Sequence, residues 1–244
     1  MRQVFAIFKR EFAAYFATPV AYVFIVIFLL AMGAFTFYIG HFYDNGAANL
    51  GVFFGYHPWL YLFLVPAVGM RLWAEERRLG TMELLLTLPV PVWASVAGKF
   101  LAAWAFTGVA LLLTFPIWVT VNYLGNPDNG VILAGYAGSF LMAGAYLAIS
   151  AAISATTTSQ VIAFVVSVVV CFLFTIAGAP LVLDVFQAWA PVVLVNTISG
   201  FSFLTHFQAI SSGVIDLRDL IYFGSLIVLF LMVNVVVVDL KKSN

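Results

Sequence analysis

The residues best suited to ionic interactions are concentrated in one short stretch, residues 71–89. This stretch holds six of the twenty Asp, Glu, Lys and Arg residues of the chain, and long apolar runs lie on both sides of it. Charged side chains are strongly disfavoured in apolar surroundings. We therefore expect residues 71–89 to face water.

The same stretch has an internal order that predicts a short helix. Gly80 can adopt the left-handed conformation that ends one helix, and Thr81 can cap the next, with Glu83 in its first turn. The residues from Met82 onward make about two turns, which end at Pro89 and Pro91. Three leucines are expected to be exposed on these turns: Leu84, Leu85 and Leu88. Such a helix is a candidate docking element for a partner protein; the alternative is an ordinary loop with one turn.

Residue types that carry catalysis or bind metals form no pattern in the sequence. The histidines, His41, His57 and His206, are scattered, with no Cys, Asp or Glu at ligand spacing. Ser199 and His206 share one segment, but no nucleophile motif surrounds Ser199. No glycine-rich phosphate loop followed by Lys occurs. The single cysteine, Cys171, lies in an apolar run and is interpreted as a packing residue. These patterns favour neither a metalloenzyme nor a serine protease nor an ATPase.

The composition is that of an integral membrane protein. The chain is 64% hydrophobic and 8% charged, with a mean hydropathy of +1.11, whereas globular domains carry roughly 25% charged residues. The formal net charge is zero, which leaves no basic surface for nucleic acid. We expect no cleavable signal peptide, because the first apolar run is too long and no A-x-A site follows it.

Apolar runs of about 20 residues predict an all-α, polytopic protein with six transmembrane helices. A single transmembrane domain is expected over residues 1–244, and the predicted spans are 20–42, 52–72, 98–123, 131–155, 161–183 and 220–238. Span four carries Gly135, Ser139 and Ala143 at four-residue spacing, which lets helices approach closely. Pro66 and Pro116 lie inside spans two and three.

Residues 2–17 predict a helix on the membrane surface. Its aromatic residues share one face at helical spacing: Phe5, Phe8, Phe12, Tyr15 and Phe16. The basic residues lie mainly off that face, as in a helix in the headgroup plane. The alternative is that residues 2–17 are the frayed start of the first span.

The distribution of Lys and Arg predicts the orientation of the chain. Nine of the ten fall on one side of the predicted spans and only Arg218 on the other, a strong positive-inside signal. Both termini and residues 71–89 are therefore expected in the cytoplasm. The outer segment, residues 184–219, is rich in aromatic residues and is expected to form one or two short helices dipping into the outer leaflet; the alternative is a plain outer loop.

The predicted spans carry no Asp, Glu or Arg in their central thirds, and Lys99 is expected to extend from the cytoplasmic edge. The polar residues within the spans are expected mostly to bond their own helix backbone: Thr36, Thr107, Thr114, Ser139, Ser150, Ser154, Ser167, Thr175, Ser225 and Asn234. Ion-coupled carriers generally need ionisable or unwound polar sites at the midplane. This alternative is therefore disfavoured.

The segment from Glu75 to Pro89, with its Glu-x-x-x-Gly-Thr-x-Glu pattern, resembles the cytoplasmic signature of type-2 ABC exporter permeases. Gly98-Lys99-Phe100 is similar to the family's entry into the third span, and residues 203–222 resemble its gliding-motility and nitrous-oxide-reductase-maturation branch. The likeness covers essentially the whole chain.

This resemblance implies that the stretch is a coupling helix that binds a separate ATP-hydrolysing subunit. The implied binding residues are Glu75, Glu76, Arg77, Gly80, Thr81, Met82, Glu83, Leu84, Leu85, Leu88 and Pro89. It implies two permease chains, alike or sister chains, with two ATPase subunits that carry the ATP and magnesium. The permease itself would have no catalytic residue, cofactor or metal. The expected location is the bacterial inner membrane.

The resemblance also implies that residues 2–17 form the connecting helix and residues 184–219 the paired re-entrant helices. It raises an extracytoplasmic accessory protein as a further partner. Two functions remain open: export of a substrate, and transmission of ATP-driven motion to an outer protein. The pathway would be lined by ordinary apolar and aromatic side chains, which indicates apolar or amphipathic cargo only weakly.

Overall fold

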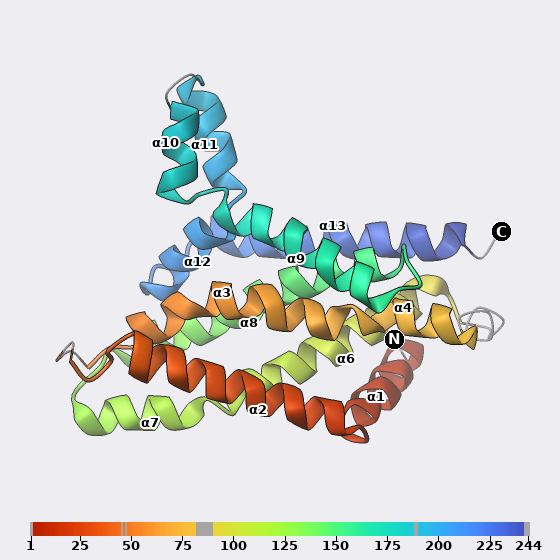
Figure 1. The fold of residues 1–244 in the computed structure, drawn as a ribbon, viewed down its shortest axis with the longest axis horizontal. Helices are drawn as coiled ribbons and strands as arrows, with labels where there is room; N and C mark the ends of the chain where they lie inside the picture. Colours follow the sequence, from red (N-terminus) through yellow and green to blue (C-terminus); the bar gives the residue numbers. More distant parts are fainter. Residues whose placement is uncertain (1, 45, 47, 82–89, 188–189, 242–244) are drawn as a thin grey trace.

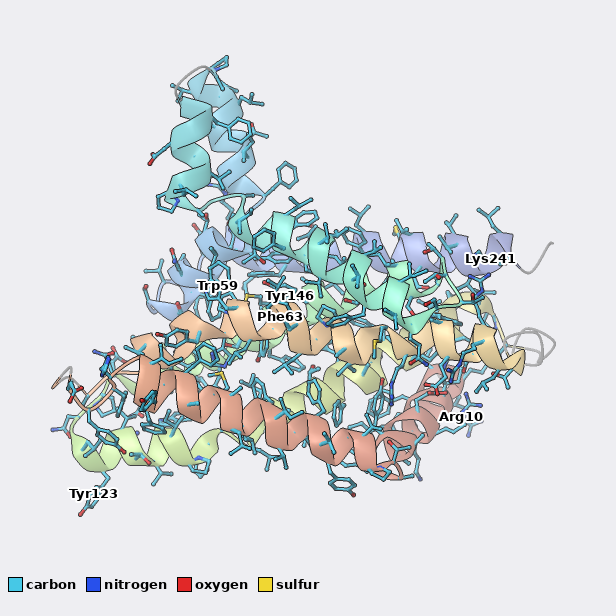
Figure 2. All side chains as sticks on the ribbon, viewed as in Figure 1. Arg10, Trp59, Phe63, Tyr123, Tyr146 and Lys241 are labelled. Carbon is cyan, nitrogen blue, oxygen red and sulfur yellow. The ribbon has the colours of Figure 1, made fainter. Side chains whose placement is uncertain are left out.

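The computed structural model describes residues 2–44, 46, 48–81, 90–187 and 190–241, and within these ranges every regular element is a helix. The helices form an elongated bundle, and the chain ends lie toward the end of it that carries α4 (Arg71–Leu79) (Figure 1). We call this the α4 end. Arg10 and Lys241 lie toward it, whereas Tyr123 lies at the opposite end (Figure 2).

The chain begins with a helix that packs on the bundle rather than extending into the first span. α1 (Arg2–Phe16) is separated from α2 (Pro19–Gly33) by Thr18, whose backbone is extended ahead of Pro19. η1 (Ala34–Ile39), a π-helical stretch, continues α2. α1 packs against α6 (Val92–Leu112), where Tyr15 stacks on Phe106 with ring centroids 4.9 Å apart.

Helices α3 (Gly51–Gly69) and α4 form one continuous apolar stretch, with Pro58 and Pro66 inside α3. α6 is followed after a short turn by α7 (Phe115–Leu124). The expected third span is therefore divided just before Pro116. A proline is well suited to the first turn of a new helix, where its missing N–H is not needed.

The longest helix, α8 (Asn129–Ser154), lies in the centre of the bundle against α3, α6, α9, α12 and α13. It begins at Asp128, whose Oδ1 accepts the N–H of Gly130 at 2.9 Å. A Cβ added at Gly135 would lie 2.4 Å from the ring of Phe54. The predicted close approach at this small residue is confirmed.

The last part of the chain differs from the expected ranges. α9 (Gln160–Ile176) ends earlier than the predicted fifth span, and α10 (Pro180–Gln187) follows it. α11 (Val192–Gly200) and α12 (Phe203–Ser211) come next, so the outer segment has more helices than predicted. α10 and α11 stand side by side away from the bundle, while α13 (Leu217–Leu240) returns along it (Figure 1).

Five helical stretches of the described chain are long and apolar enough to cross a membrane: Pro19–Ile39, Gly51–Leu79, Val92–Leu124, Asn129–Ser154 and Leu217–Leu240. α11 and α12 pass the same test only together and are bent by 66°, as in a broken span or a re-entrant loop. α9 is apolar but has 17 residues, the lower limit of the usual length. The chain is therefore a multi-pass, all-helical membrane protein.

Candidate functional site

The residues predicted to bind a partner begin in α4, and the structure describes them as far as Thr81. Gly80 ends α4 with a φ of 70°, which confirms the predicted left-handed conformation. The Thr81 hydroxyl donates to the carbonyl of Glu76 at 3.3 Å and so helps to close the last turn of α4. The predicted short helix lies outside the described residues: Met82, Glu83, Leu84, Leu85, Leu88 and Pro89.

A single hydroxyl joins the start of α4 to the end of α8. Ser154 Oγ accepts the backbone N–H groups of Trp73 at 3.2 Å and Ala74 at 3.0 Å, and it donates to the carbonyl of Met70 at 2.7 Å. These N–H groups belong to the first turn of α4, where a helix has no internal acceptors. α4 is therefore fixed to the central helix through backbone groups as well as by packing.

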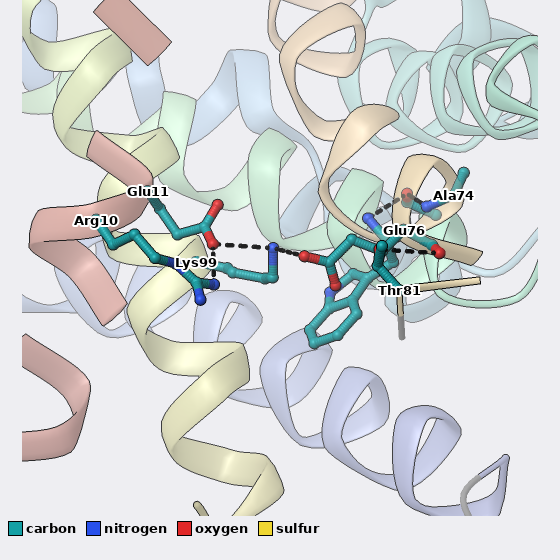
Figure 3. Close-up of polar contacts among 8 residues, drawn as sticks. Arg10, Glu11, Ala74, Glu76, Thr81 and Lys99 are labelled. Carbon is teal, nitrogen blue, oxygen red and sulfur yellow. Dashed lines mark hydrogen bonds and ion pairs between the residues drawn. The ribbon is translucent and has the colours of Figure 1, made fainter. Parts of the chain in front are cut away.

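Lys99 joins three helices at the α4 end. Its Nζ lies 2.6 Å from Glu76 Oε1 on α4 and 3.4 Å from Glu11 Oε1 on α1, and it also lies 5.5 Å from the centre of the Trp73 ring (Figure 3). The Lys99 side chain is only 4% exposed. The expectation that Lys99 extends into solvent was wrong, because two carboxylates on neighbouring helices enclose its ammonium group.

The two carboxylates are held differently. Arg10 lies 2.6 Å from Glu11. Burial disfavours the charged form of Glu11, but Lys99 and Arg10 together outweigh burial and lower the pKa of its carboxyl below the ordinary value. The second oxygen of Glu76, Oε2, is buried without a hydrogen-bond partner among the described residues.

The ionic cluster borders a hollow of about 250 Å³ between α1, α4 and α6. Glu75 and Arg71 line this hollow from α4, and Tyr15 lines it from α1. Polar residues therefore line the hollow between α1, α4 and α6, next to the ionic cluster. The predicted residue Glu75 faces this space rather than the interior contact with Lys99.

Two cations bind the carbonyls at the end of α8. Arg77 Nη1 donates to the carbonyl of Ala155 at 3.2 Å, and Lys241 Nζ donates to the carbonyls of Ala155 at 3.2 Å and Thr156 at 2.8 Å. Positive groups are favoured at a helix C-terminus. Burial and the nearby Arg77 lower the pKa of Lys241. The predicted residue Arg77 is thus bound within the chain.

The predicted residues therefore separate into two groups. Glu76 and Arg77 bind other helices of the same chain, whereas Gly80 and Thr81 are exposed beyond them. Leu79, which was not among the predicted residues, is 63% exposed next to Gly80. Of the predicted residues that the structure describes, the exposed ones therefore lie at this end of α4, next to residue 82 in the chain.

Sequence reasoning did not assign Glu11, Lys99 and Ser154 to this site. Glu11 lies at helical spacing from Tyr15 and Phe8, which could have indicated that it faces the bundle. Ser154 was expected to bond its own helix, but it bonds α4. Nothing in the local pattern distinguishes it from Ser150, which does bond its own helix, at Tyr146.

The other polar residues of the predicted spans fall into two groups according to their hydrogen bonds. Several bond a carbonyl of their own helix as predicted: Thr107, Thr114, Ser150, Thr175 and Ser225. Four others have side-chain atoms that are buried without a hydrogen-bond partner among the described residues: Thr36, Ser139, Ser167 and Asn234. The prediction thus holds for the first group and fails for the second group as well as for Ser154.

At the opposite end of the bundle, His206 on α12 contacts both α11 and α13. Its Nδ1 lies 2.5 Å from Asp219 Oδ1 and its Nε2 lies 2.9 Å from the carbonyl of Gly200. Ser199 Oγ donates instead to the carbonyl of Asn196 at 3.0 Å. The part of the chain that the structure describes has no group of three or more His, Cys, Asp or Glu residues placed to hold a metal. Through its two contacts, His206 joins the end of α11 to the start of α13.

The fold and this site are those of a multi-pass helical membrane protein whose charged side chains gather where α4 leaves the packed helices. Comparison with known families agrees. A family model described as ABC-2 family transporter protein matches residues 5–240. The chain therefore belongs to the ABC-2 transporter family, as its permease component. Among curated proteins, none matches the sequence.

Proposed function

We propose that this chain is the membrane-spanning subunit of an ATP-driven exporter and that separate ATPase subunits bind residues 75–89. Two permease chains, identical or sister chains, and two ATPase subunits would form the working unit. ATP and magnesium would be bound, and ATP hydrolysed, on the ATPase subunits. Closure of the ATPase pair would move the 82–89 segments and open a path between the two permeases.

The observation that carries this proposal is the way in which α4 is joined to the rest of the chain. Its end at Gly80 and Thr81 is exposed, while Glu76 binds Lys99 on α6 and the start of α4 binds Ser154 on α8. A displacement applied beyond Gly80 would therefore act on α1, α6 and α8 together. A segment that only connected two spans would not need these contacts.

The proposal is tested by changing the segment that would enter the ATPase subunit. Glu83→Arg or Leu85→Asp should abolish the ATPase activity that depends on the permease, while the protein remains inserted in the membrane. The measurement is ATP hydrolysis by the ATPase subunit reconstituted with each permease variant. Asn126→Asp, on the predicted outer side, is the matched control and should leave the activity unchanged. Normal stimulation in the Glu83 and Leu85 variants would contradict the proposal.

Family membership does not distinguish the branch or the cargo. We propose the gliding-motility and nitrous-oxide-reductase-maturation branch on the resemblance of residues 203–222, with location in the bacterial inner membrane and an extracytoplasmic accessory protein as a further partner. An adjacent gene for an ATPase would support the subunit assignment, and other neighbouring genes would narrow the cargo.

A second function is favoured by the outer helices. α10 and α11 stand away from the bundle at the end opposite α4 (Figure 1), where they could contact an outer protein. In this alternative the permease transmits ATP-driven motion through residues 184–219 without moving a substrate. A transport assay in sealed vesicles distinguishes the two functions. ATP-dependent work on an outer protein without movement of any substrate would favour transmission.

A further inference from the structure

A long apolar groove lies on the bundle where α1 meets α6 and α8. Its first section has a volume of about 650 Å³. Phe5 and Phe8 line it from α1, Trp93 and Leu101 from α6, and Phe140 from α8. The lining is almost entirely apolar, so the section offers no site for a soluble polar ligand.

A second section continues the groove along the same helices. It has a volume of about 450 Å³ and shares Ala105 and Phe140 with the first section. It extends past Leu112 to Trp118, near the opposite end of the bundle. Each section alone falls within the roughly 300–1,000 Å³ that is usual for ligand sites.

The side chains that line the junction of the two sections are ordered before any ligand binds. The rings of Trp104 and Phe140 are stacked, with centroids 4.5 Å apart and planes 6° apart. Trp104 Nε1 also donates to the carbonyl of Phe140 at 2.8 Å. A preformed wall lowers the entropic cost of binding, because these side chains need not be ordered by the ligand.

The depth of the first section matches one leaflet of the membrane. From Trp93 to Ala105 the helix α6 rises about 18 Å at 1.5 Å per residue. This is slightly more than half of the ~30 Å hydrocarbon core. The section begins at the α4 end, which the distribution of Lys and Arg assigns to the cytoplasm. It therefore runs through the inner leaflet.

Exposed positive charge lies on α1, the helix that contributes Phe5 and Phe8 to the first section. Arg2 and Lys9 lie on α1 at helical spacing from Phe5, three residues before and four after it. Both are exposed, and neither has an ion-pair partner among the described residues, whereas Arg10 is paired with Glu11. Phe5 is 66% exposed between them. An apolar slot with two available cations on one of its helices is complementary to a lipid with a negatively charged headgroup.

We propose that this groove binds one anionic phospholipid of the inner leaflet. An acyl chain lies along α6 against Trp93, Leu101 and the Trp104–Phe140 wall. The phosphate lies at the membrane surface near Arg2 and Lys9. The lipid would hold α1 against α6 on the membrane-facing surface. On the inner side of α1, Glu11 already binds Lys99 of α6. The site is separate from residues 75–89 and does not depend on the proposed function.

Native mass spectrometry of the full-length protein, mixed with matched amounts of phosphatidylglycerol or phosphatidylcholine, tests the proposal. Two basic residues near the surface predict a preference of about 30-fold for phosphatidylglycerol. The double variant Arg2→Gln, Lys9→Gln should reduce this preference to less than about threefold. Arg78→Gln removes an exposed basic residue of α4 and is the matched control, which should keep the preference.

A second variant tests the chain-binding part of the groove. Ala105→Phe fills the junction of the two sections and should weaken the binding of both lipids, whereas Val236→Phe on the exposed face of α13 should not. Equal binding of the two lipids, or an unchanged preference in the Arg2 and Lys9 variant, would overturn the proposal. So would disulfide cross-linking of Leu101→Cys between two chains, since the groove would then be an interface between copies.

Discussion

Lys99 is the residue on which the ionic contacts of the α4 end depend. Its ammonium group lies between Glu76 and Glu11 and is almost completely buried. Each glutamate side chain is about one-fifth exposed, so water compensates only part of their charge. The group is stable while the cation is present, and removal of the cation leaves two carboxylates facing each other in a poorly solvated space.

Lys99→Met keeps the length of the side chain and removes its charge. We expect the free energy of unfolding to fall by about 3 kcal/mol, because two partly buried carboxylates lose their partner. The measurement is denaturant unfolding of the purified protein in detergent. Arg78→Met, at an exposed position on α4, should change the stability by less than about 0.5 kcal/mol. Equal effects of the two substitutions would show that the cluster contributes little.

The lowered pKa of Glu11 predicts how the cluster responds to pH. Since Lys99 and Arg10 hold the folded-state pKa below the ordinary value of 4.5, the stabilisation is complete above that value. It is lost as the pH falls through the folded-state pKa. Thermal unfolding should therefore show Glu11→Gln less stable than the native protein at pH 7, with the difference shrinking below pH 4.5. A difference that is constant over this range would contradict the assignment.

α4 is the element that connects a membrane span to the segment that we propose receives a partner. It continues the apolar stretch of α3, yet its last residues are exposed. The hydrogen bonds of Ser154 hold its first turn, and the contacts of Glu76 and Arg77 hold its last turns. α4 is therefore connected to the bundle as far as Arg77, and at Gly80 the left-handed residue changes the direction of the chain.

Ser154→Ala tests this connection. It leaves the N–H groups of Trp73 and Ala74 without their acceptor and should lower the free energy of unfolding by about 1–3 kcal/mol. Faster hydrogen exchange should appear first in α4, because the loss is local. Ser225→Ala is the matched control, since that hydroxyl bonds only its own helix at Tyr222. If exchange in α4 is unchanged in Ser154→Ala, the hydrogen bonds do not fix the helix.

The two ends of the molecule carry different elements. The chain termini, α4 and the basic residues Arg10 and Lys241 lie toward one end of the bundle. α7 and the paired helices α10 and α11 lie toward the other (Figure 1). With α9 counted as a span, an even number of crossings returns the chain to the side from which it started.

Labelling from outside the cell tests this arrangement. In a Cys171→Ala background, Asn126→Cys should react with a membrane-impermeant thiol reagent and Arg78→Cys should not, because these positions lie at opposite ends of the bundle. Permeabilised cells should label both variants, which controls for accessibility. Labelling of both positions in intact cells would contradict the six-span arrangement.

Features that depend on near neighbours in the chain were predictable from the sequence. The helical class and the membrane location follow from long apolar runs, since backbone groups in lipid must bond within the segment. The conformation of Gly80 follows because a residue without Cβ adopts positive φ at little cost. The close approach at Gly135 follows from small residues at four-residue spacing. Whether residues 82–89 form a helix stays a prediction.

Features that depend on which helices pack together could be seen only in the tertiary structure. Glu11 and Lys99 are far apart in sequence, and neither has a local pattern that identifies its partner. Their contact exists because α1 packs on α6 beside α4. Ser154 and Ser150 occupy similar sequence settings, yet only Ser154 lies where α4 begins. Local periodicity records which face of a helix is apolar, but it carries no information about the helix that will cover that face.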